Sequence, residues 1–358
     1  MTGPKPTAIK TLRVRVRDKH AKTLRAMAYE TNQVWNYCAE LRERVARERG
    51  RWLSGFDLQH YTNGASKEFD LIGSPTVQQV CEDYAVKCRK AKRLRLRWRK
   101  SFGERRSLGW VPFKARAAKW KNGQVFFAGH HFNVWDSYGL SSFTFRGGCF
   151  AEDSRGRWYF CVAVEAPIKM SRGQDNIGID LGLKTTATCS DGTTLSGTPY
   201  RDLEPALAVA QRARKKARVR AIHAKIRNRR QDALHKFSTA LVERCGEIYV
   251  GNVSASRLAK TNMAKSVLDA GWASLRTMLD YKARQRGIVY REIDEAYTTR
   301  GCSECGSLSG PQGLTGLSVR EWECGHCGGV HDRDVNAARN ILALGRGHAP
   351  PAEGIPCL

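Results

Sequence analysis

Cys302-Ser-Glu-Cys305 and Cys324-Gly-His-Cys327 are two C-x-x-C pairs that stand just before the run His331-Asp-Arg-Asp-Val-Asn-Ala-Ala-Arg-Asn340. Eighteen residues separate the two pairs, a spacing typical of a four-thiolate zinc site. The eight other cysteines are scattered singly along the chain, so a disulfide framework is the weaker explanation. We therefore predict one structural zinc ion, because four thiolates leave no coordination position open for a catalytic water. The predicted ligands are Cys302, Cys305, Cys324 and Cys327.

Two distant segments each carry an acidic residue in a setting typical of a metal site. Asp334 stands before an Ala-rich helical run from Val335 to Leu344, where it could equally be a helix cap. Upstream, Asn176-Ile-Gly-Ile-Asp180-Leu-Gly182 predicts an apolar strand that ends on an Asp and is followed by a glycine turn. This pattern resembles the first strand of an RNase H-like nuclease, which presents a metal-binding Asp.

Together these motifs resemble the TnpB family of transposon-encoded, RNA-guided nucleases, which are related to type V CRISPR effectors. The resemblance is carried by I-G-I-D-L-G around Asp180, by the two cysteine pairs and by D-R-D-V-N-A-A-R-N-I, and it covers residues 176–345. The first half of the chain matches the family only in size, charge and order of elements.

The resemblance implies hydrolysis of a phosphodiester by two Mg²⁺ ions that are held by a cluster of carboxylates. Asp180 would bridge both ions. Asp334 matches the last catalytic Asp of the family, and Asp332 is the second candidate for that role because D-R-D offers two acids.

The third carboxylate departs from the family pattern. The family's fourth strand usually ends in Glu, whereas this chain has Ile248-Tyr-Val-Gly251-Asn252. The next strand runs into Asp294 and Glu295, and parallel neighbours lie about 4.8 Å apart, so an acid from that strand could reach the same metal. We predict Glu295 as the third ligand and Asp294 as the second choice, as in a branch of the family with a relocated Glu. The alternatives are a loop or cap role for Glu295, or a chain that no longer cleaves.

The charge of the chain predicts a polyanionic partner. Its 61 Lys and Arg exceed its 34 Asp and Glu, which gives a net charge of +27. Nucleic acid would neutralise this charge in a salt-sensitive way. No apolar run approaches the roughly 20 residues that span a bilayer, and Met1 to Lys10 lacks the apolar core of a signal peptide. We therefore expect a cytoplasmic protein that acts at the bacterial nucleoid and does not bind membranes.

Several basic or polar segments are candidate nucleic-acid contacts, although each could also be a solvated surface. Strand 11–17 alternates apolar residues with arginines, and residues 87–100 interleave cations with Leu and Trp. Two glutamines at the start of a helix expected over 76–100 are similar to the place where the family reads a short DNA motif beside the target. The candidates are Arg13, Arg15, Gln78, Gln79, Arg93, Arg97, Arg214, Lys215 and Arg218.

The periodicity predicts an α+β multidomain protein. Short strands over 108–167, together with strand 11–17, suggest a small antiparallel β-barrel (the wedge) with a helical insertion. An RNase H-like (RuvC) α/β domain with an inserted zinc ribbon follows, with single helices expected over 203–244 and 265–286. The expected domains are residues 1–18 and 105–170 (wedge), 19–104 (helical recognition insertion), 171–300 and 329–346 (nuclease), 301–328 (zinc ribbon, binding target nucleic acid) and 347–358 (disordered tail).

The resemblance implies an RNA-guided DNA endonuclease that takes its guide RNA from the transposon end and reads a short motif beside a double-stranded DNA target. We expect a monomer in the RNA complex, with two Mg²⁺ ions and one Zn²⁺ ion. The alternatives are a nuclease-dead RNA-guided DNA-binding regulator and a non-guided RNase H-like nuclease.

Overall fold

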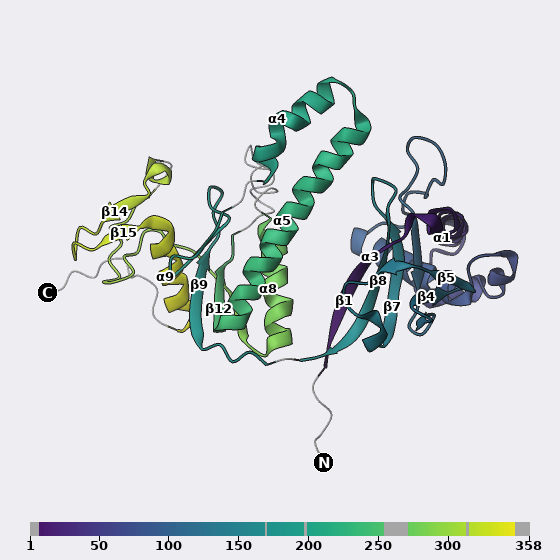
Figure 1. The fold of residues 1–358 in the computed structure, drawn as a ribbon, viewed down its shortest axis with the longest axis horizontal. Helices are drawn as coiled ribbons and strands as arrows, with labels where there is room; N and C mark the ends of the chain where they lie inside the picture. Colours follow the sequence, from purple (N-terminus) through teal and green to yellow (C-terminus); the bar gives the residue numbers. More distant parts are fainter. Residues whose placement is uncertain (1–6, 169, 197–198, 254–270, 313–314, 348–358) are drawn as a thin grey trace, which may run out of the picture. The chain divides into compact units, whose positions relative to one another are not determined.

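The structure is a computed structural model that describes residues 7–168, 170–196, 199–253, 271–312 and 315–347. The chain forms two compact units, Met1–Pro167 and Ile168–Leu358 (Figure 1). Residues 348–358 of the predicted tail and residues 265–270 of the predicted helix 265–286 lie outside the described residues. Among the described residues, no helix combines the length and apolar character that crossing a membrane requires.

The first unit is built on a five-stranded antiparallel sheet with the strand order β2-β7-β8-β1-β6. A smaller antiparallel sheet has the order β3-β4-β5. The mixed α/β architecture confirms the coarse fold class, whereas closure of these strands into a barrel stays a prediction. The strands are β1 (Thr7–Val16), β2 (Trp110–Phe113), β3 (Ala118–Lys121), β4 (Gln124–Phe127), β5 (His130–Phe132), β6 (Val134–Trp135), β7 (Phe145–Glu152) and β8 (Trp158–Pro167).

Strand β1 shows why this sequence forms a sheet with one buried face. Leu12, Val14 and Val16 alternate with more exposed residues and are at most 2% exposed, as the period of two in a strand requires. Phe113, Phe150 and other aromatic rings pack in the same core. Within the region 108–167, where the sequence predicts short strands, Leu140–Ser142 instead forms a 3-10 turn and β7 begins only at Phe145.

The helices α1 (Ala21–Arg49), α2 (Gly55–Tyr61) and α3 (Ser74–Ala91) lie in sequence between β1 and β2. The helix expected over 76–100 is wrong at its C-terminal end, because α3 stops at Ala91 and Lys92 adopts a left-handed conformation. The amide of Arg93 then donates to the carbonyl of Cys88, which closes the helix end. The sequence that follows, R-L-R-L-R-W-R, has the period of two that suits an extended chain.

The second unit contains a five-stranded mixed sheet with the order β11-β10-β9-β12-β13. Strands β9, β12 and β13 are parallel, whereas β10 and β11 run antiparallel to their neighbours. The strands are β9 (Asp175–Asp180), β10 (Ala187–Cys189), β11 (Thr194–Leu195), β12 (Cys245–Gly251) and β13 (Val289–Ile293). A two-stranded ribbon is formed by β14 (Glu321–Glu323) and β15 (Val330–Asp332).

Helix α9 (Arg333–Gly345) packs closely on β9, and α8 (Trp272–Arg286) packs on α5 (Lys216–Arg244). The contact with β9 requires glycine at one position. A Cβ atom on Gly178 would lie 2.0 Å from the carbonyl oxygen of Ala338, so any larger residue would push α9 away from the strand. The glycine of I-G-I-D therefore brings the start of α9 towards the end of β9.

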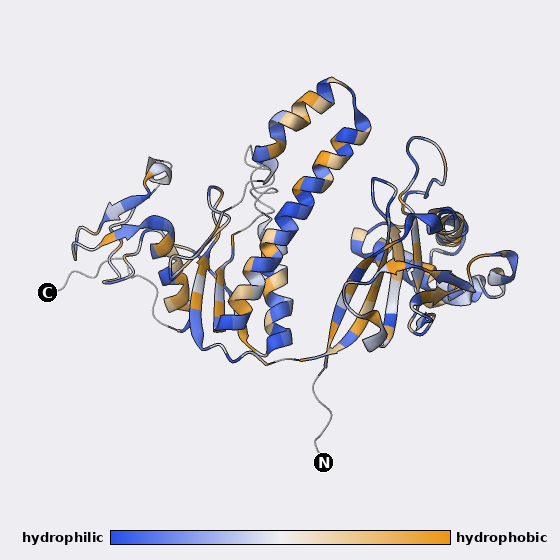
Figure 2. Ribbon diagram, viewed as in Figure 1, coloured by the Kyte–Doolittle hydropathy of each residue, from blue (hydrophilic) through white to orange (hydrophobic). Residues whose placement is uncertain are grey.

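The single helix expected over 203–244 is wrong, because it is divided into α4 (Pro199–Arg212) and α5. Arg214 adopts a left-handed conformation between the two helices, which form a hairpin (Figure 1). The turn lets Leu207 pack against Ile222 and Ile226. Figure 2 shows that much of α5 is hydrophilic. The contact between α4 and α5 therefore rests on this small apolar cluster.

Candidate active site

Three acidic residues lie at or near the ends of elements that meet at one edge of the sheet in the second unit. Asp180 is the last residue of β9, Glu295 follows β13 by two residues, and Asp334 lies in the first turn of α9. Val250 pairs with Ile179 and Gly251 pairs with Ile293, so the three parallel strands end level with one another. Their side chains therefore stand at the same carboxyl edge, as the sequence pattern predicts.

The electrostatics of Asp180 show that the other two acids are near it. Burial, followed by the negative charges of Asp334 and Glu295, raises the pKa of Asp180 to about 7, and Arg333 acts in the opposite direction. Burial also raises the pKa of Glu295, with a contribution from Asp294 that is opposed by Arg276. Asp180 and Glu295 are therefore harder to ionise than carboxyl groups in water, a condition that a divalent cation at this edge would relieve.

Gly251 creates the space that Glu295 occupies. A Cβ atom built on Gly251 would lie 2.8 Å from Oε2 of Glu295 and 3.2 Å from Cδ1 of Ile341. Gly251 ends β12, the strand that would carry a Glu if the chain followed the resemblance fully. The carboxylate of Glu295 therefore stands where the first atoms of a side chain on β12 would otherwise be.

Asp332 and Asp294, the second choices from the sequence, both serve the local backbone. Asp332 precedes α9 and accepts a hydrogen bond from the amide of Val335 at 2.8 Å, so it is the N-cap of that helix. Asp294 is exposed and accepts from the amide of Ala296 at 3.2 Å. These contacts favour Asp334 and Glu295 as the acids that face Asp180.

Arg320 contacts Asp334 directly. Its Nη1 lies 3.2 Å from Oδ1 and 2.9 Å from Oδ2 of the carboxylate. Arg320 precedes β14 of the ribbon, so the ribbon supplies a cation to the acidic cluster. This arginine is not among the residues predicted from the sequence, because nothing in its local sequence separates it from the many other cations.

The four predicted cysteines form a compact cluster whose sulfurs all lie within 4.8 Å of one another. Cys302 Sγ lies 3.7 Å from Cys327 Sγ, and Cys305 Sγ lies 3.6 Å from Cys324 Sγ. A zinc–sulfur bond of about 2.3 Å gives a tetrahedron with edges of about 3.8 Å, so this arrangement fits a four-thiolate zinc site.

Neighbouring side chains support the same donor set. The hydroxyl of Ser309 lies 3.1 Å from Cys324 Sγ, and this hydrogen bond is the main reason that the pKa of the thiol is lowered to about 5. The thiolate form, which binds zinc, is therefore favoured. Nε2 of His331 lies 3.0 Å from Cys302 Sγ, and the His331 ring packs on Trp322.

Asn336 and Asn340 join the cysteine cluster to the acidic site. The side-chain amides of both residues donate to the carbonyl oxygen of Gly301 at 2.7 Å, and Asn340 also donates to that of Thr298 at 2.8 Å. Oδ1 of Asn336 accepts from the amide of Ser303 at 2.8 Å. Both asparagines are buried on α9, so this helix holds the loop between Glu295 and Cys302. Their spacing of four residues in N-A-A-R-N was the available signal, because it places both on one helix face.

The candidate nucleic-acid residues differ in how free their side chains are. Arg13 stacks over the ring of Tyr159 at 3.7 Å, Arg15 pairs with Asp18, and Gln79 donates to Asp83 at 2.9 Å. The remaining candidates are exposed: Gln78, Arg93, Arg97, Arg214, Lys215 and Arg218.

The segments that carry these residues are similar to known proteins. Residues 159–262 match the family model OrfB_IS605, described as "Probable transposase", and residues 272–341 match "Cas12f1-like, TNB domain". A Streptomyces pristinaespiralis protein named "Putative RNA-guided DNA endonuclease" is 37% identical over 221 residues, which are 57% of this chain and 54% of that protein.

Two further similarities extend the comparison. "TnpB-like protein L79" of Acanthamoeba polyphaga mimivirus is 28% identical over 227 residues, which are 55% of this chain and 42% of that protein. The solved structure of a Cas12f1–sgRNA–target DNA complex aligns with 94% of this chain and 99% of its own, at 15% identity and a TM-score of 0.39.

The matches span about half the length of the relatives. Both family models fall on the segments that carry the acidic residues and the cysteines. Residues 159–262 and 272–341 are therefore similar to these two family models, and the chain is similar to proteins named as TnpB-like and as putative RNA-guided DNA endonucleases.

Proposed function

We propose that this protein is an RNA-guided DNA endonuclease whose single nuclease site contains Asp180, Glu295 and Asp334. The observation that carries the proposal is the convergence of these three acids at one sheet edge, where burial, and then the negative charges of Asp334 and Glu295, raise the pKa of Asp180 to about 7. Buried carboxyl groups with raised pKa values that stand beside further acids are typical of functional sites, and a divalent metal would stabilise their charged forms. The name of the Streptomyces relative supports the activity class.

We assign the sheet of the second unit to the RNase H-like class. Three parallel strands flanked by two antiparallel strands, with acids at the carboxyl ends of β9 and β13 and a further acid on α9, support this assignment. The wedge, helical insertion and ribbon that the sequence predicts are part of the same proposal.

The three acids would hold two Mg²⁺ ions, since Mg²⁺ prefers hard oxygen ligands. Bound ions of this kind supply Lewis acidity for the attacking water and for the leaving oxygen of a phosphodiester. The residues of this chain contribute position and charge. Asp180 contributes a carboxylate fixed at a strand end, Glu295 fills the space beside Gly251, and Asp334 is held by the first turn of α9 and by Arg320.

Zn²⁺ held by the four cysteines would fix the ribbon. Through Asn336 and Asn340 the ribbon is connected to the loop that follows Glu295. This zinc is therefore structural, and its effect on cleavage passes through the position of the acids.

The test is cleavage by the full chain expressed with RNA transcribed from the end of its own transposon. The bound RNA is sequenced, and a supercoiled plasmid with the matching target is incubated with the purified complex and Mg²⁺. We expect cleavage in wild type and none in Asp180→Asn. A complex that binds the target without cutting it would identify a nuclease-dead regulator, and cleavage without any bound RNA would identify a non-guided nuclease.

A further inference from the structure

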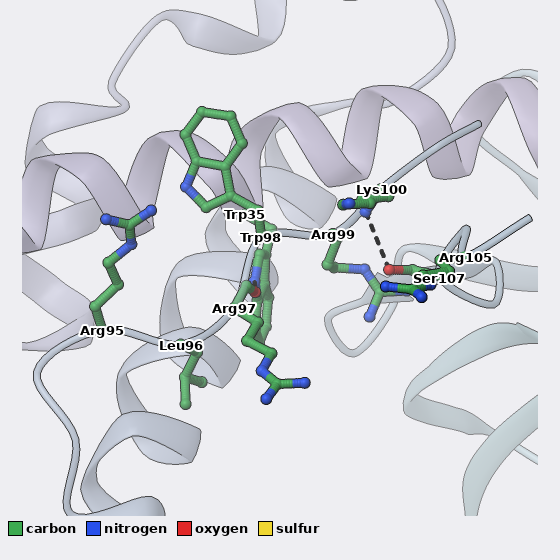
Figure 3. A pocket seen from close by; sticks show the side chains of 9 residues that line it. All are labelled: Trp35, Arg95, Leu96, Arg97, Trp98, Arg99, Lys100, Arg105 and Ser107. Carbon is green, nitrogen blue, oxygen red and sulfur yellow. Dashed lines mark hydrogen bonds between the residues drawn. The ribbon is translucent and has the colours of Figure 1, made fainter. Parts of the chain in front are cut away.

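The first unit contains a pocket that is not part of the proposed nuclease site. Its volume is about 800 Å³, within the range of about 300–1,000 Å³ that small-ligand sites have. The segment 95–100, which follows α3, supplies most of its lining, together with Trp35 of α1 (Figure 3). The pocket is therefore lined mainly by cationic side chains and two indole rings.

Side chains of the helices fix the backbone of this segment through hydrogen bonds. The amide of Leu96 donates to the hydroxyl of Tyr84 at 3.1 Å, and Nε1 of Trp35 donates to the carbonyl of Arg97 at 3.2 Å. The side chain of Asn36 accepts a hydrogen bond from the amide of Arg99 and donates one to its carbonyl oxygen. Because its polar backbone groups are satisfied in this way, the segment presents its side chains from a fixed backbone, which lowers the entropic cost of binding.

The cations of the pocket fall into two groups. Arg99 is used by the protein itself, since it donates to Asn32 at 2.6 Å and to the carbonyl of Leu108 at 2.5 Å, and Arg95 pairs with Glu43. For the side chains of Arg97, Lys100 and Arg105, by contrast, the described part of the chain offers no recorded acidic partner or hydrogen bond. These three cations, here called the pocket cations, are free to bind phosphate groups.

Trp98 adds a flat apolar surface beside the pocket cations. It is 47% exposed, although it stands in a basic segment, and the Arg95 guanidinium lies 5.9 Å from its ring centroid. A base can stack on such a ring when its own face is free, as in a single strand, whereas bases in a duplex already stack on each other. An acidic protein would satisfy the cations but would leave the indole unused.

We infer that this pocket binds an unstacked nucleotide of a single-stranded nucleic acid, with its base on Trp98 and its phosphates on Arg97, Lys100 and Arg105. The inference rests on the proposed function only for the origin of that strand, which is either the guide RNA or a DNA strand of the opened target. Both have the same phosphates and bases, so the experiment must distinguish them.

The first measurement is equilibrium binding of oligouridylate and oligothymidylate of equal length to the full chain freed of RNA. Trp98→Ala should weaken binding of at least one of them about tenfold without changing the salt dependence, because stacking releases no counterions. Arg97→Gln should lower the slope of log affinity against log salt by about 0.7, the contribution of one phosphate contact in a single strand.

Two matched variants serve as controls. Trp52→Ala removes another exposed tryptophan, 55% exposed and outside this pocket, and should leave the affinity unchanged. Trp98→Phe keeps an aromatic face and should retain most of the affinity. If Trp98→Ala binds both oligonucleotides as tightly as wild type, the inference is overturned and an acidic protein surface becomes the better candidate for the pocket.

The second measurement locates the strand in the assembled complex by ultraviolet crosslinking. After nuclease and Glu-C digestion, Trp98 lies in the peptide between Glu82 and Glu104, which is long enough for mass spectrometry. A ribonucleotide adduct on this peptide assigns the pocket to the guide RNA, and a deoxyribonucleotide adduct seen only with target assigns it to DNA. Absence of both adducts in a complex that crosslinks elsewhere would also overturn the inference.

Neither measurement uses cleavage, so the two proposals can fail separately. A complex that cuts its target but forms no adduct at residues 83–104 defeats the pocket alone. A complex that forms this adduct but never cuts with Mg²⁺ defeats the nuclease proposal alone.

Discussion

Gly251 and Glu295 share one space at the end of the central strands, since a Cβ atom on Gly251 would lie 2.8 Å from Oε2 of Glu295. In the proposed site, the carboxylate of Glu295, which follows β13, therefore occupies space that a side chain at the end of β12 would need. This relationship explains why the strand of an acidic site can end in glycine. It also makes the position of the carboxylate testable by moving it from one strand to the other.

A carboxylate supplied from β12 should partly replace the carboxylate of Glu295 in DNA cleavage. We expect Glu295→Gln to lower cleavage by at least about 100-fold, because metal ligands matter at least as much as the groups that support them. In the double variant Gly251→Glu/Glu295→Ala, the acid returns to β12 and the competing side chain is removed. We expect that variant to cleave at least about tenfold faster than Glu295→Ala alone, measured as the initial rate of plasmid nicking. Equal rates for wild type and Glu295→Gln would remove this residue from the site.

Removing Asn336 should weaken both the fold and the metal site. Asn336→Ala leaves the part-buried amide of Ser303 without its acceptor, which costs about 1–3 kcal/mol of unfolding free energy. Because the loop after Glu295 loses a contact, the Mg²⁺ concentration for half-maximal cleavage should also rise. Urea unfolding and Mg²⁺ titration measure the two effects. Arg339→Ala, an exposed change on the same helix, is the control, and an unchanged Mg²⁺ requirement in Asn336→Ala would show that the contact is only structural.

Loss of the ribbon metal should reduce cleavage without touching the acids. We expect Cys305→Ser to lower the zinc content below one ion per chain and to reduce cleavage about 10- to 100-fold, since the ribbon is tied to α9 through Asn336. Elemental analysis and plasmid cleavage measure the two quantities. Cys161→Ser, which changes a half-buried thiol in β8, should preserve both. Full activity in a zinc-free Cys305→Ser protein would contradict the link between the ribbon and the active site.

The stability of the Mg²⁺-free protein should fall as the pH rises. The pKa of Asp180 is about 7 in the folded chain and about 3.9 in an unfolded one, so between these values the folded state holds a proton that the unfolded state has lost. The free energy of unfolding therefore decreases from about pH 4 to about pH 7. Urea unfolding across this range should show that decrease in wild type and a smaller one in Asp180→Asn. Added Mg²⁺ should reverse the trend in wild type, and an identical pH profile for both proteins would rule out Asp180 as its source.

The sequence alone was informative wherever a signal is local. The C-x-x-C spacing predicted a cluster that the structure brings within 4.8 Å, because each pair is fixed by its own turn. I-G-I-D and D-R-D-V-N predicted a strand end and a helix start for the same reason. The alternation in R-L-R-L-R-W-R is also a local signal. Its period of two argues against a continued helix, in agreement with the end of α3 at Ala91.

What depended on contacts between distant residues was decided by the tertiary structure. Asp332 and Asp334 are equivalent in sequence, but the first caps α9 and the second faces Asp180. The break at Arg214 exists because α4 must fold back to bury Leu207 on α5. Spacing along a chain fixes which groups a single turn can bring together. Which turns then meet is set by the packing of whole elements, and no short stretch of sequence contains that information.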